Sequence, residues 1–299
     1  MAADIVDVVA AQAELEVVRA EREVFRLAAD SEHPFLVQAH AVFQDEQRVY
    51  FVMEFIGGGD LMFHIQSSPF GAADCRFFAA QVLLVLEFLH ARGVLYRDLK
   101  LDNILLGADG YVKLADYGLC RLGMGGACTT RTFCGTPEFM APEILLDQPY
   151  ALAVDFWAFG VLLYQMLECR SPFYGSTEKE TFHAILAGRL AFAPDTDRAG
   201  RALVARLLVR SPAERLGCRP GEGWAAVRAH PFFDGIDWAA LAAKQLPARI
   251  RPALRAPDDV SNFDEAFTLE PVVLTPQPSL TLPQDFDALA KARELFASF

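Results

Sequence analysis

A short polar run at 95–103 holds the side chains whose types and spacing most directly indicate chemistry. It reads Leu-Tyr-Arg-Asp-Leu-Lys-Leu-Asp-Asn and contains Asp98, Lys100 and Asn103, and Asp116 follows. These groups could make a phosphoryl-transfer site, in which Asp98 accepts the proton of a hydroxyl nucleophile and Lys100 stands near the moving phosphate. Asn103 and Asp116 would supply oxygen ligands, which Mg²⁺ prefers in octahedral geometry.

The elements around these groups follow from the spacing of apolar residues. Helices are expected where apolar residues recur every three or four positions, and strands where short apolar runs are bounded by turn residues. The predicted helices lie at 11–29, 60–93 with a turn near 67–69, 153–168, 177–188 and 199–209. The predicted strands lie at 37–43 and 48–55, and short strands and loops are expected around the polar motifs at 94–122.

A change in composition after residue 246 indicates a separate tail. Seven prolines occur between residues 247 and 283. Proline removes backbone donors that regular structure needs. We therefore expect an extended tail that lies on the globule, with a short helix near its end.

The net charge bears on which partners the chain could bind, and the cysteine pattern on the cellular compartment in which it lies. The net charge of −12 argues against nucleic acid as the main partner and suits basic peptides better. The six cysteines include no C-x-x-C pair, which fits reduced thiols in a cytoplasmic protein rather than a zinc site. Before Arg19 there is no basic residue to start a signal peptide. The apolar stretch 151–167 is interrupted by Asp155 and Gln165, so it indicates a buried helix rather than a transmembrane segment.

An Arg-Asp pair on a loop is usually an ordinary surface ion pair. The order of the motifs that follow indicates a reactive site instead. Asp-Tyr-Gly at 116–118 is followed by Ala-Pro-Glu at 141–143, and then by Asp155 and Arg215. Arg215 is a candidate partner for Glu143. This order resembles the signature set of eukaryotic protein kinases, and the resemblance covers nearly the whole chain.

Several stretches are similar to the AGC group of serine/threonine kinases. Tyr96 replaces the usual histidine of that signature, and AGC-like runs occur at 132–139, 262–264, 275–276 and 296–299. Within the group, the runs at 33–37, 58–62 and 116–120 look most like protein kinase C. The fungal enzymes of that family are the most similar, and protein kinase N is the near neighbour.

The resemblance implies an α+β, two-lobed protein-kinase-like fold with an incomplete N-lobe, a helical C-lobe and an AGC C-terminal tail. Residues 1–59 would form the partial N-lobe with one helix, two strands and the hinge, residues 60–246 the C-lobe, and residues 247–299 the tail. Glu21 matches the glutamate of the N-lobe helix. The first lysine is Lys100. The glycine-rich loop, the strand lysine and the first three strands of the family are therefore missing.

Two explanations for these missing parts are open. The chain could be an N-terminally truncated product of a longer kinase gene, or a shortened pseudokinase that binds partners. The first is favoured because the other catalytic positions are intact. An N-lobe reduced to one helix and two strands should be loosely held, with an apolar strand edge exposed at 48–55.

The resemblance also implies nucleotide and substrate contacts. Met53 matches the gatekeeper residue, and the backbone of Glu54 and Ile56 would bind adenine. Leu61 and Leu105 would sandwich the adenine ring, although ordinary core packing would bury them equally. The implied nucleotide-binding set is Met53, Glu54, Ile56, Asp60, Leu61, Leu105 and Phe263. The implied substrate-binding set is Asp60, Asp102 and Thr136.

Phosphorylation sites are implied in the activation segment and in the tail. Thr132 matches the activation-segment phosphosite, which an upstream kinase would modify, and Thr275 matches the turn-motif phosphosite. Arg97 and Arg121 would clamp the phosphate on Thr132, because a phosphate adds nearly two negative charges and strong acceptors. Glu143, Asp155 and Arg215 match structural positions.

We therefore expect a monomeric, cytoplasmic serine/threonine kinase of protein kinase C type that uses ATP and Mg²⁺ on basic protein substrates. This chain by itself would have low activity. The alternative is a non-catalytic interaction module. A small-molecule kinase is disfavoured by the peptide-site run at 135–138 and by the tail.

Overall fold

A computed structural model describes residues 2–45, 48–271 and 273, with the side chains of the first helix described from Leu15 onward. The strands are β1 (Ala39–Gln44), β2 (Val49–Met53), β3 (Ile104–Leu106) and β4 (Val112–Leu114). The helices are α1 (Ala2–Ser31), α2 (Leu61–Ser67), α3 (Ala72–Ala91), α4 (Pro142–Leu145), α5 (Ala153–Glu168), α6 (Glu178–Ala187), α7 (Arg198–Leu207), α8 (Gly223–Arg228), α9 (Trp238–Ala242) and α10 (Glu265–Thr268).

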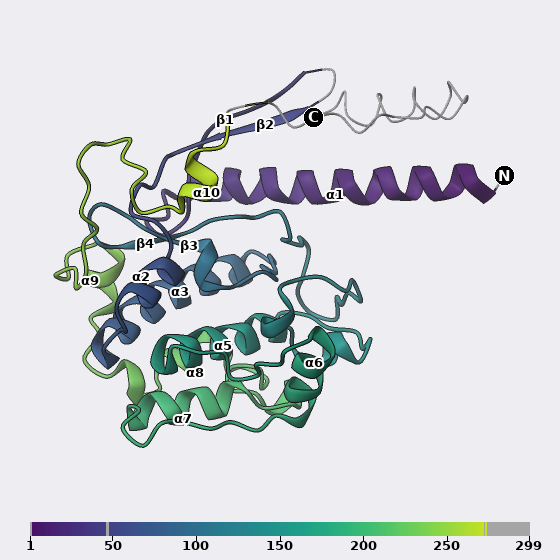
Figure 1. Ribbon diagram of the computed structural model, residues 1–299. Coiled ribbons are helices and arrows are strands. Elements are labelled where there is room, and N and C mark those ends of the chain that lie inside the picture. The colour runs from purple at the N-terminus through teal and green to yellow at the C-terminus, as the bar shows by residue number, and fades with distance from the viewer. Residues whose placement is uncertain (1, 46–47, 272, 274–299) are drawn as a thin grey trace.

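The chain has a small upper part and a larger helical part (Figure 1). The upper part holds α1 and the antiparallel pair β1–β2. The helices α5, α6, α7 and α8 form the lower part, and α2, α3 and the antiparallel hairpin β3–β4 lie between them. The predicted mixture of helix and strand is confirmed, with two two-stranded sheets among the described residues. The polar motifs precede β3 and follow β4, so they lie at the same end of this antiparallel hairpin.

Helix α5 is the centre of the lower part. Its residues from Val154 to Met166 are buried, and it packs against α3 and α7. A Cβ at Gly160 would lie 2.8 Å from the Cβ of Leu207, so only glycine lets α5 and α7 approach this closely. The apolar run therefore forms a core helix, as predicted. Among the described helices, none combines the length and the apolar character needed to cross a bilayer.

Helix α1 packs one face on the rest of the protein and extends beyond it (Figure 1). Val24, Phe25 and Ala28 are buried, whereas Arg26 pairs with exposed neighbours on the opposite face. The ring of Phe25 meets Tyr117 edge-on, with centroids 4.8 Å apart. The predicted helix is confirmed, is longer than expected, and lies against the motif that contains Asp116.

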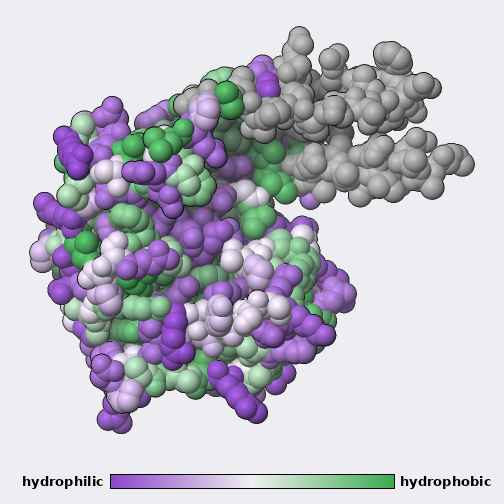
Figure 2. Space-filling view, viewed as in Figure 1, coloured by the Kyte–Doolittle hydropathy of each residue, from purple (hydrophilic) through white to green (hydrophobic). Residues whose placement is uncertain are grey.

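The pair β1–β2 gains no third strand among the described residues, which is consistent with the expected incomplete N-lobe. Apolar side chains of this pair and of the segment after it reach the surface: Phe43, Val52, Met53 and Phe55 are exposed. Figure 2 shows apolar groups at the surface of this upper part. The expected exposure of an apolar strand edge is therefore confirmed.

The tail returns across the hairpin β3–β4 and the hinge. The hydroxyl of Tyr111 donates to the carbonyl of Leu246 at 2.5 Å, and Arg249 pairs with Asp74 at 2.6 Å. Further on, the amide nitrogen of Asn262 donates to the carbonyl of Gly57 at 3.0 Å. The tail therefore lies on the globule over this stretch, as expected. The helix predicted near the chain end, and Thr275, fall outside the described residues, and the bounds of the three predicted domains stay predictions.

Candidate active site

The carboxylate of Asp98 is the centre of a compact polar cluster. It accepts hydrogen bonds from the hydroxyl of Thr136 at 2.8 Å and from the side-chain amide of Asn103 at 3.0 Å. The ammonium of Lys100 lies 3.0 Å from the same carboxylate and 3.3 Å from the Thr136 hydroxyl. Asp98 is 6% exposed, so these partners replace water around a charge that would be costly to bury alone.

The hairpin β3–β4 brings Asp116 to this cluster. Asn103 directly precedes β3 and Asp116 lies two residues after β4, and the amide of Ala115 donates to the carbonyl of Asn103 at 2.9 Å. The hydroxyl of Tyr96 donates to the carbonyl of Ala115 at 2.6 Å. Asp98 and Asp116 therefore lie at the same end of one hairpin, on the two loops that it joins.

Asn103 and Asp116 have the groups that a hard cation needs. The amide nitrogen of Asn103 donates to Asp98, which leaves the amide oxygen as the group that could bind a metal. The exposed carboxylate of Asp116 accepts from the amide of Gly118 at 3.1 Å and keeps lone pairs for a ligand. An amide oxygen and a carboxylate fit Mg²⁺, which completes its octahedron with water and phosphate oxygens.

Both loops have strained backbone. Arg97 and Asp116 have φ of 72° and 54°, a left-handed conformation that costs a non-glycine residue roughly 1–2 kcal/mol. Asp155, fully buried in the first turn of α5, accepts the backbone amides of Tyr96 and Arg97 at 2.9 and 3.0 Å. These charge-assisted bonds hold the loop 95–103 in its conformation and aim Asp98 at Thr136.

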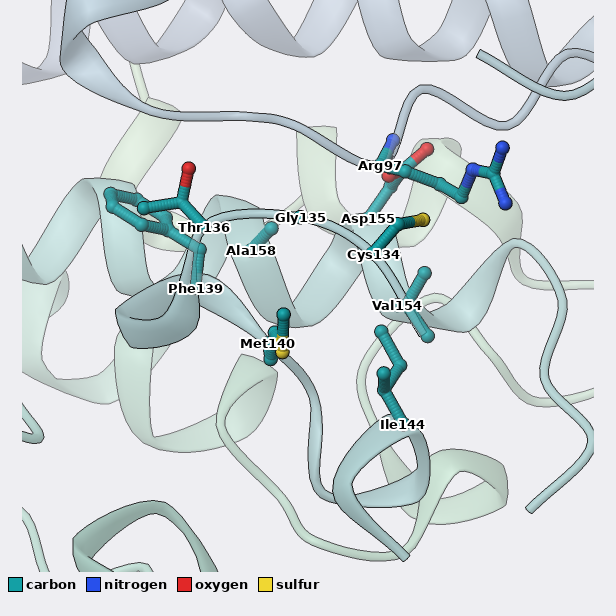
Figure 3. Close-up of a pocket in the computed structure, with 10 residues that line it drawn as sticks. All are labelled: Arg97, Cys134, Gly135, Thr136, Phe139, Met140, Ile144, Val154, Asp155 and Ala158. Carbon is teal, nitrogen blue, oxygen red and sulfur yellow. Dashed lines mark hydrogen bonds between the residues drawn. The ribbon is translucent and has the colours of Figure 1, made fainter. Parts of the chain in front are cut away.

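The segment that carries Thr136 approaches the loop 95–103 very closely. Gly135 has φ of 108°, and a Cβ there would lie 2.9 Å from the carbonyl oxygen of Arg97. A cavity of about 10 Å³, which is room for about one water, lies beside this contact. Figure 3 shows Thr136, Gly135 and Cys134 along this cavity beside Arg97 and Asp155, with apolar side chains on the other sides.

A buried ion pair holds the segment that follows. The two terminal guanidinium nitrogens of Arg215 donate to the carboxylate of Glu143, at 2.9 and 3.1 Å. Arg215 also donates to the carbonyls of Ala153 at 2.6 Å and Val209 at 3.1 Å. The pair therefore joins α4 to the start of α5 and to the chain after α7.

A second pocket lies between α1 and the segments that contain Arg97, Arg121 and Thr132. This cavity of about 420 Å³ is lined by Thr132, by the two predicted clamp residues Arg97 and Arg121, and by Arg19 of α1. The hydroxyl of Tyr150 donates to the carbonyl of Thr132 at 2.6 Å, which fixes the backbone beside the pocket. Sequence reasoning missed Arg19; its place on the helix that carries Glu21 was the available signal.

Glu21 faces the same end of the hairpin from α1. Burial raises the pKa of the Glu21 carboxyl, and the nearby Asp116 carboxylate raises it further. Two acids thus lie close together. Lys100 is the first lysine of the chain, so α1, β1 and β2 carry no lysine that could pair with Glu21.

The predicted nucleotide-binding residues lie around the hinge. The amide of Leu106 donates to the carbonyl of Gly59 at 2.8 Å, and Asp60 forms a β-bridge with Leu105. Ile56 and Leu61 are buried, as either a nucleotide-binding or a core role predicts, and Met53 is exposed. These contacts place β3 directly beneath the hinge.

Two more hinge residues are held by specific partners. The carboxylate of Glu54 accepts from the ammonium of Lys113 at 2.5 Å and from the backbone amide of Gln38 at 2.8 Å, and the backbone amide of Glu54 donates to the carbonyl of Gln38 at 3.0 Å. The ring of Phe263 in the tail lies 6.0 Å from that of Phe55, between centroids. The tail therefore closes over the hinge at the predicted nucleotide-binding position.

Asp60 caps the first turn of α2, where it accepts the amide of Phe63 at 2.8 Å. Burial raises the pKa of the Asp60 carboxyl, and the Asp102 carboxylate adds to that increase. The negative electrostatic potentials of the Asp60 and Asp102 carboxylates therefore overlap near the hinge. Such a field attracts cationic side chains.

Comparison with known proteins is consistent with this geometry. Residues 2–233 match the family model of the protein kinase domain, and residues 254–295 match that of the protein kinase C terminal domain. The chain belongs to the protein kinase family.

Curated relatives narrow the group within that family. The chain is 51% identical to protein kinase C of Aspergillus fumigatus over 267 residues, which cover 89% of the chain and 24% of that protein. It is 50% identical to protein kinase C-like 2 of Schizosaccharomyces pombe over 89% of the chain and 26% of that protein. For protein kinase C eta type of Homo sapiens the identity is 44%, over 93% of the chain and 40% of that protein. The chain spans about a quarter of the length of these fungal relatives.

The predicted resemblance to protein kinase C with an AGC tail is thereby confirmed. By family the chain is a protein serine/threonine kinase, and this family binds ATP and generally uses Mg²⁺. The roles of the individual site residues stay predictions.

Proposed function

We propose that this site transfers the γ-phosphate of ATP to serine or threonine hydroxyls of basic protein substrates. The observation that carries the proposal is the arrangement around Asp98. Its carboxylate is held by Thr136, Lys100 and Asn103 at the end of the hairpin where Asp116 also lies. A base, a cation and two metal-ligating oxygens are thus gathered in one place.

Each residue has a distinct task in this proposal. ATP with Mg²⁺ would supply the phosphoryl group, and Asn103 and Asp116 would hold the metal. Asp98 orients the substrate hydroxyl and takes its proton, while Lys100 stabilises negative charge that develops on the transferred group. The hydroxyl of Thr136 keeps the carboxylate of Asp98 in one orientation. Positioning and charge stabilisation of this kind account for most of the rate in phosphoryl transfer.

Acidic groups near the hinge support a preference for basic substrates. Asp60 and Asp102 share one field, so an arginine or lysine of a substrate would relieve their mutual repulsion. The net charge of −12 adds long-range attraction. The chain would act as a cytoplasmic monomer on protein substrates and would not use nucleic acid as its main partner.

Regulation by phosphorylation is part of the proposal. An upstream kinase would modify Thr132, and the guanidinium groups of Arg97, Arg121 and Arg19 that line the same cavity would bind the phosphate. Since Arg19 belongs to α1, the phosphate would tie that helix to the activation segment. Thr275 would be a second phosphosite in the tail.

The turnover of this chain by itself would be low. Glu21 lies near Asp116, and no lysine precedes Lys100 to pair with Glu21 and the α- and β-phosphates. This observation also favours the second candidate function, a non-catalytic module that binds partners.

Asp98→Asn tests the proposal. We expect the variant to keep Mg²⁺-dependent ATP binding in a thermal-shift assay, because Asp98 is not a proposed metal ligand. Phosphate incorporation into a basic peptide should fall by about a hundredfold or more, the usual contribution of a positioned base. Asp234→Asn, the same change at an exposed carboxyl, is the matched control.

The outcomes separate the two candidate functions. Unchanged turnover in Asp98→Asn would refute the role of the base. A wild-type chain that neither binds Mg²⁺ and ATP nor phosphorylates the peptide would support the interaction module.

A further inference from the structure

A buried chain of hydrogen bonds links α8 to the loop 95–103. The indole nitrogen of Trp224 donates to Nδ1 of His90 at 2.9 Å, and Nε2 of His90 lies 2.7 Å from Oδ2 of Asp155. Asp155 in turn accepts the backbone amides of Tyr96 and Arg97. Trp224 is 4% exposed, the His90 side chain 6% and Asp155 0%, so the three side chains hold one another away from water.

The chemistry of the indole sets the direction of every bond in this chain. An indole N–H can only donate, so Nδ1 of His90 must be unprotonated and must accept. In the neutral ring the proton is then on Nε2, which donates to Asp155. Both oxygens of Asp155 thus serve as acceptors, one for Nε2–H and the amide of Tyr96 and the other for the amide of Arg97.

Aromatic packing locks Trp224 in the position that makes the first bond. Its ring stacks on Phe156 with centroids 3.9 Å apart and an interplanar angle of 12°, and it meets Phe159 edge-on at 5.5 Å. Gly217 closes over Phe156, where a Cβ would lie 2.3 Å from the ring. The indole therefore has little freedom to turn away from His90.

We propose that Trp224 is a positioning residue for the phosphotransferase site and acts through His90 and Asp155. The hydrogen bond from the Arg97 amide to Asp155 offsets the cost of the left-handed backbone at Arg97, and Asp98 is the next residue. By fixing the tautomer of His90, Trp224 fixes Asp155 and thereby the direction of Asp98. The functional consequence rests on the proposed role of Asp98 as base, whereas the chain of bonds does not.

Trp224→Phe in the full chain tests this, because phenylalanine keeps an aromatic ring on Phe156 and removes the donor. Trp238→Phe is the matched control: that ring packs on Phe233 and lies outside the chain of bonds. Amide hydrogen exchange followed by NMR is compared for Tyr96 and Arg97, and for Leu114 in the hairpin as an internal reference.

We expect Trp224→Phe to speed exchange of the Tyr96 and Arg97 amides by about fivefold or more, the effect of losing roughly one hydrogen bond, with Leu114 unchanged. Trp238→Phe should leave all three amides at their wild-type rates. Equal acceleration at all three sites in Trp224→Phe would show a merely structural role and would overturn the proposal.

A second measurement uses the wild-type chain and therefore does not depend on the folding of a variant. The ¹⁵N shifts of the His90 ring in the wild-type chain should show the neutral tautomer with the proton on Nε2. A proton on Nδ1 would overturn the chain of bonds even if Asp98 proves to be the base. Conversely, if Asp98 proves not to be the base, the tautomer and exchange results would still stand. Failure of the chain of bonds and failure of the proposed function are therefore distinguishable.

Discussion

Removal of Arg215 is the sharpest test of how the activation segment is held beside the site. Arg215→Met keeps most of the side-chain volume and removes the charge that neutralises Glu143. Arg215 is 0% exposed and Glu143 is 3% exposed, and the two groups share two hydrogen bonds at 2.9 and 3.1 Å. The substitution therefore leaves a carboxylate that has lost its partner and cannot reach water.

The expected cost follows from that burial. Breaking a buried pair by removing one partner costs about 3–5 kcal/mol. Each kcal/mol shifts the Tm of a large domain by roughly 2–4 °C, so the midpoint should fall by about 6 °C or more. The guanidinium also lies 5.2 Å from the centre of the Trp157 ring, and loss of this contact acts in the same direction.

A double-mutant cycle isolates the pair. Free energies of unfolding from urea titration are compared for the wild type, Glu143→Gln, Arg215→Met and the double variant. The double variant should lose clearly less than the sum of the single losses, because neither partner is left charged and alone.

The control is Arg228→Met, which breaks the half-exposed pair with Glu87 at 3.0 Å and should cost less than about 1 kcal/mol. If Arg215→Met costs no more than this control, the buried pair does not hold the segment.

Three further predictions concern the metal site, the pH dependence of stability and the close backbone contact. Asp116→Asn should abolish the Mg²⁺-dependent part of the ATP thermal shift; an undiminished shift would remove Asp116 from the metal site. Burial, with a smaller effect of the Arg92 guanidinium, lowers the pKa of His33 to about 4, so the unfolded chain binds more protons between pH 6.5 and 4 and stability falls as the pH falls through that range. Between pH 7 and 5 the wild type should therefore lose about 1–2 kcal/mol more than His33→Gln, and parallel urea-titration profiles would contradict the assignment. Gly135→Ala should cost about 1–3 kcal/mol, measured by the same titration, because its φ is 108° and the new Cβ would lie 2.9 Å from the Arg97 carbonyl oxygen; a neutral result would show that the segment can shift.

Local pattern was sufficient for the long helices of the lower part. Helix α5 spans Ala153–Glu168 and α6 spans Glu178–Ala187, both within a residue of the prediction. Helix α5 is apolar over nearly its whole length, and Thr177 caps α6 by accepting the amide of Glu180. Helix α1 begins at Ala2 rather than near residue 11. Element boundaries are harder to predict because the apolar spacing says little about where the last turn unwinds.

The members of the polar cluster could be predicted from the order of the motifs, but the contacts between them could not be predicted. The sequence indicated Asp98, Lys100 and Asn103 together because they lie within six residues of one another. That the hydroxyl of Thr136 also reaches Asp98 depends on the tight approach of Gly135 to the loop 95–103, which is a property of the packed chain.

The sequence by itself determined the kinase family and the long helices, and it supplied the predicted reactive side chains, because apolar patterns and motif spacing can be read along the chain without its three-dimensional structure. Only the tertiary structure decided which distant groups meet. Arg19 joins Thr132 at one pocket, and Trp224 reaches His90 from 134 positions away. Such contacts arise where separate helices pack around one core, and packing depends on the shape and volume of all the neighbours at once.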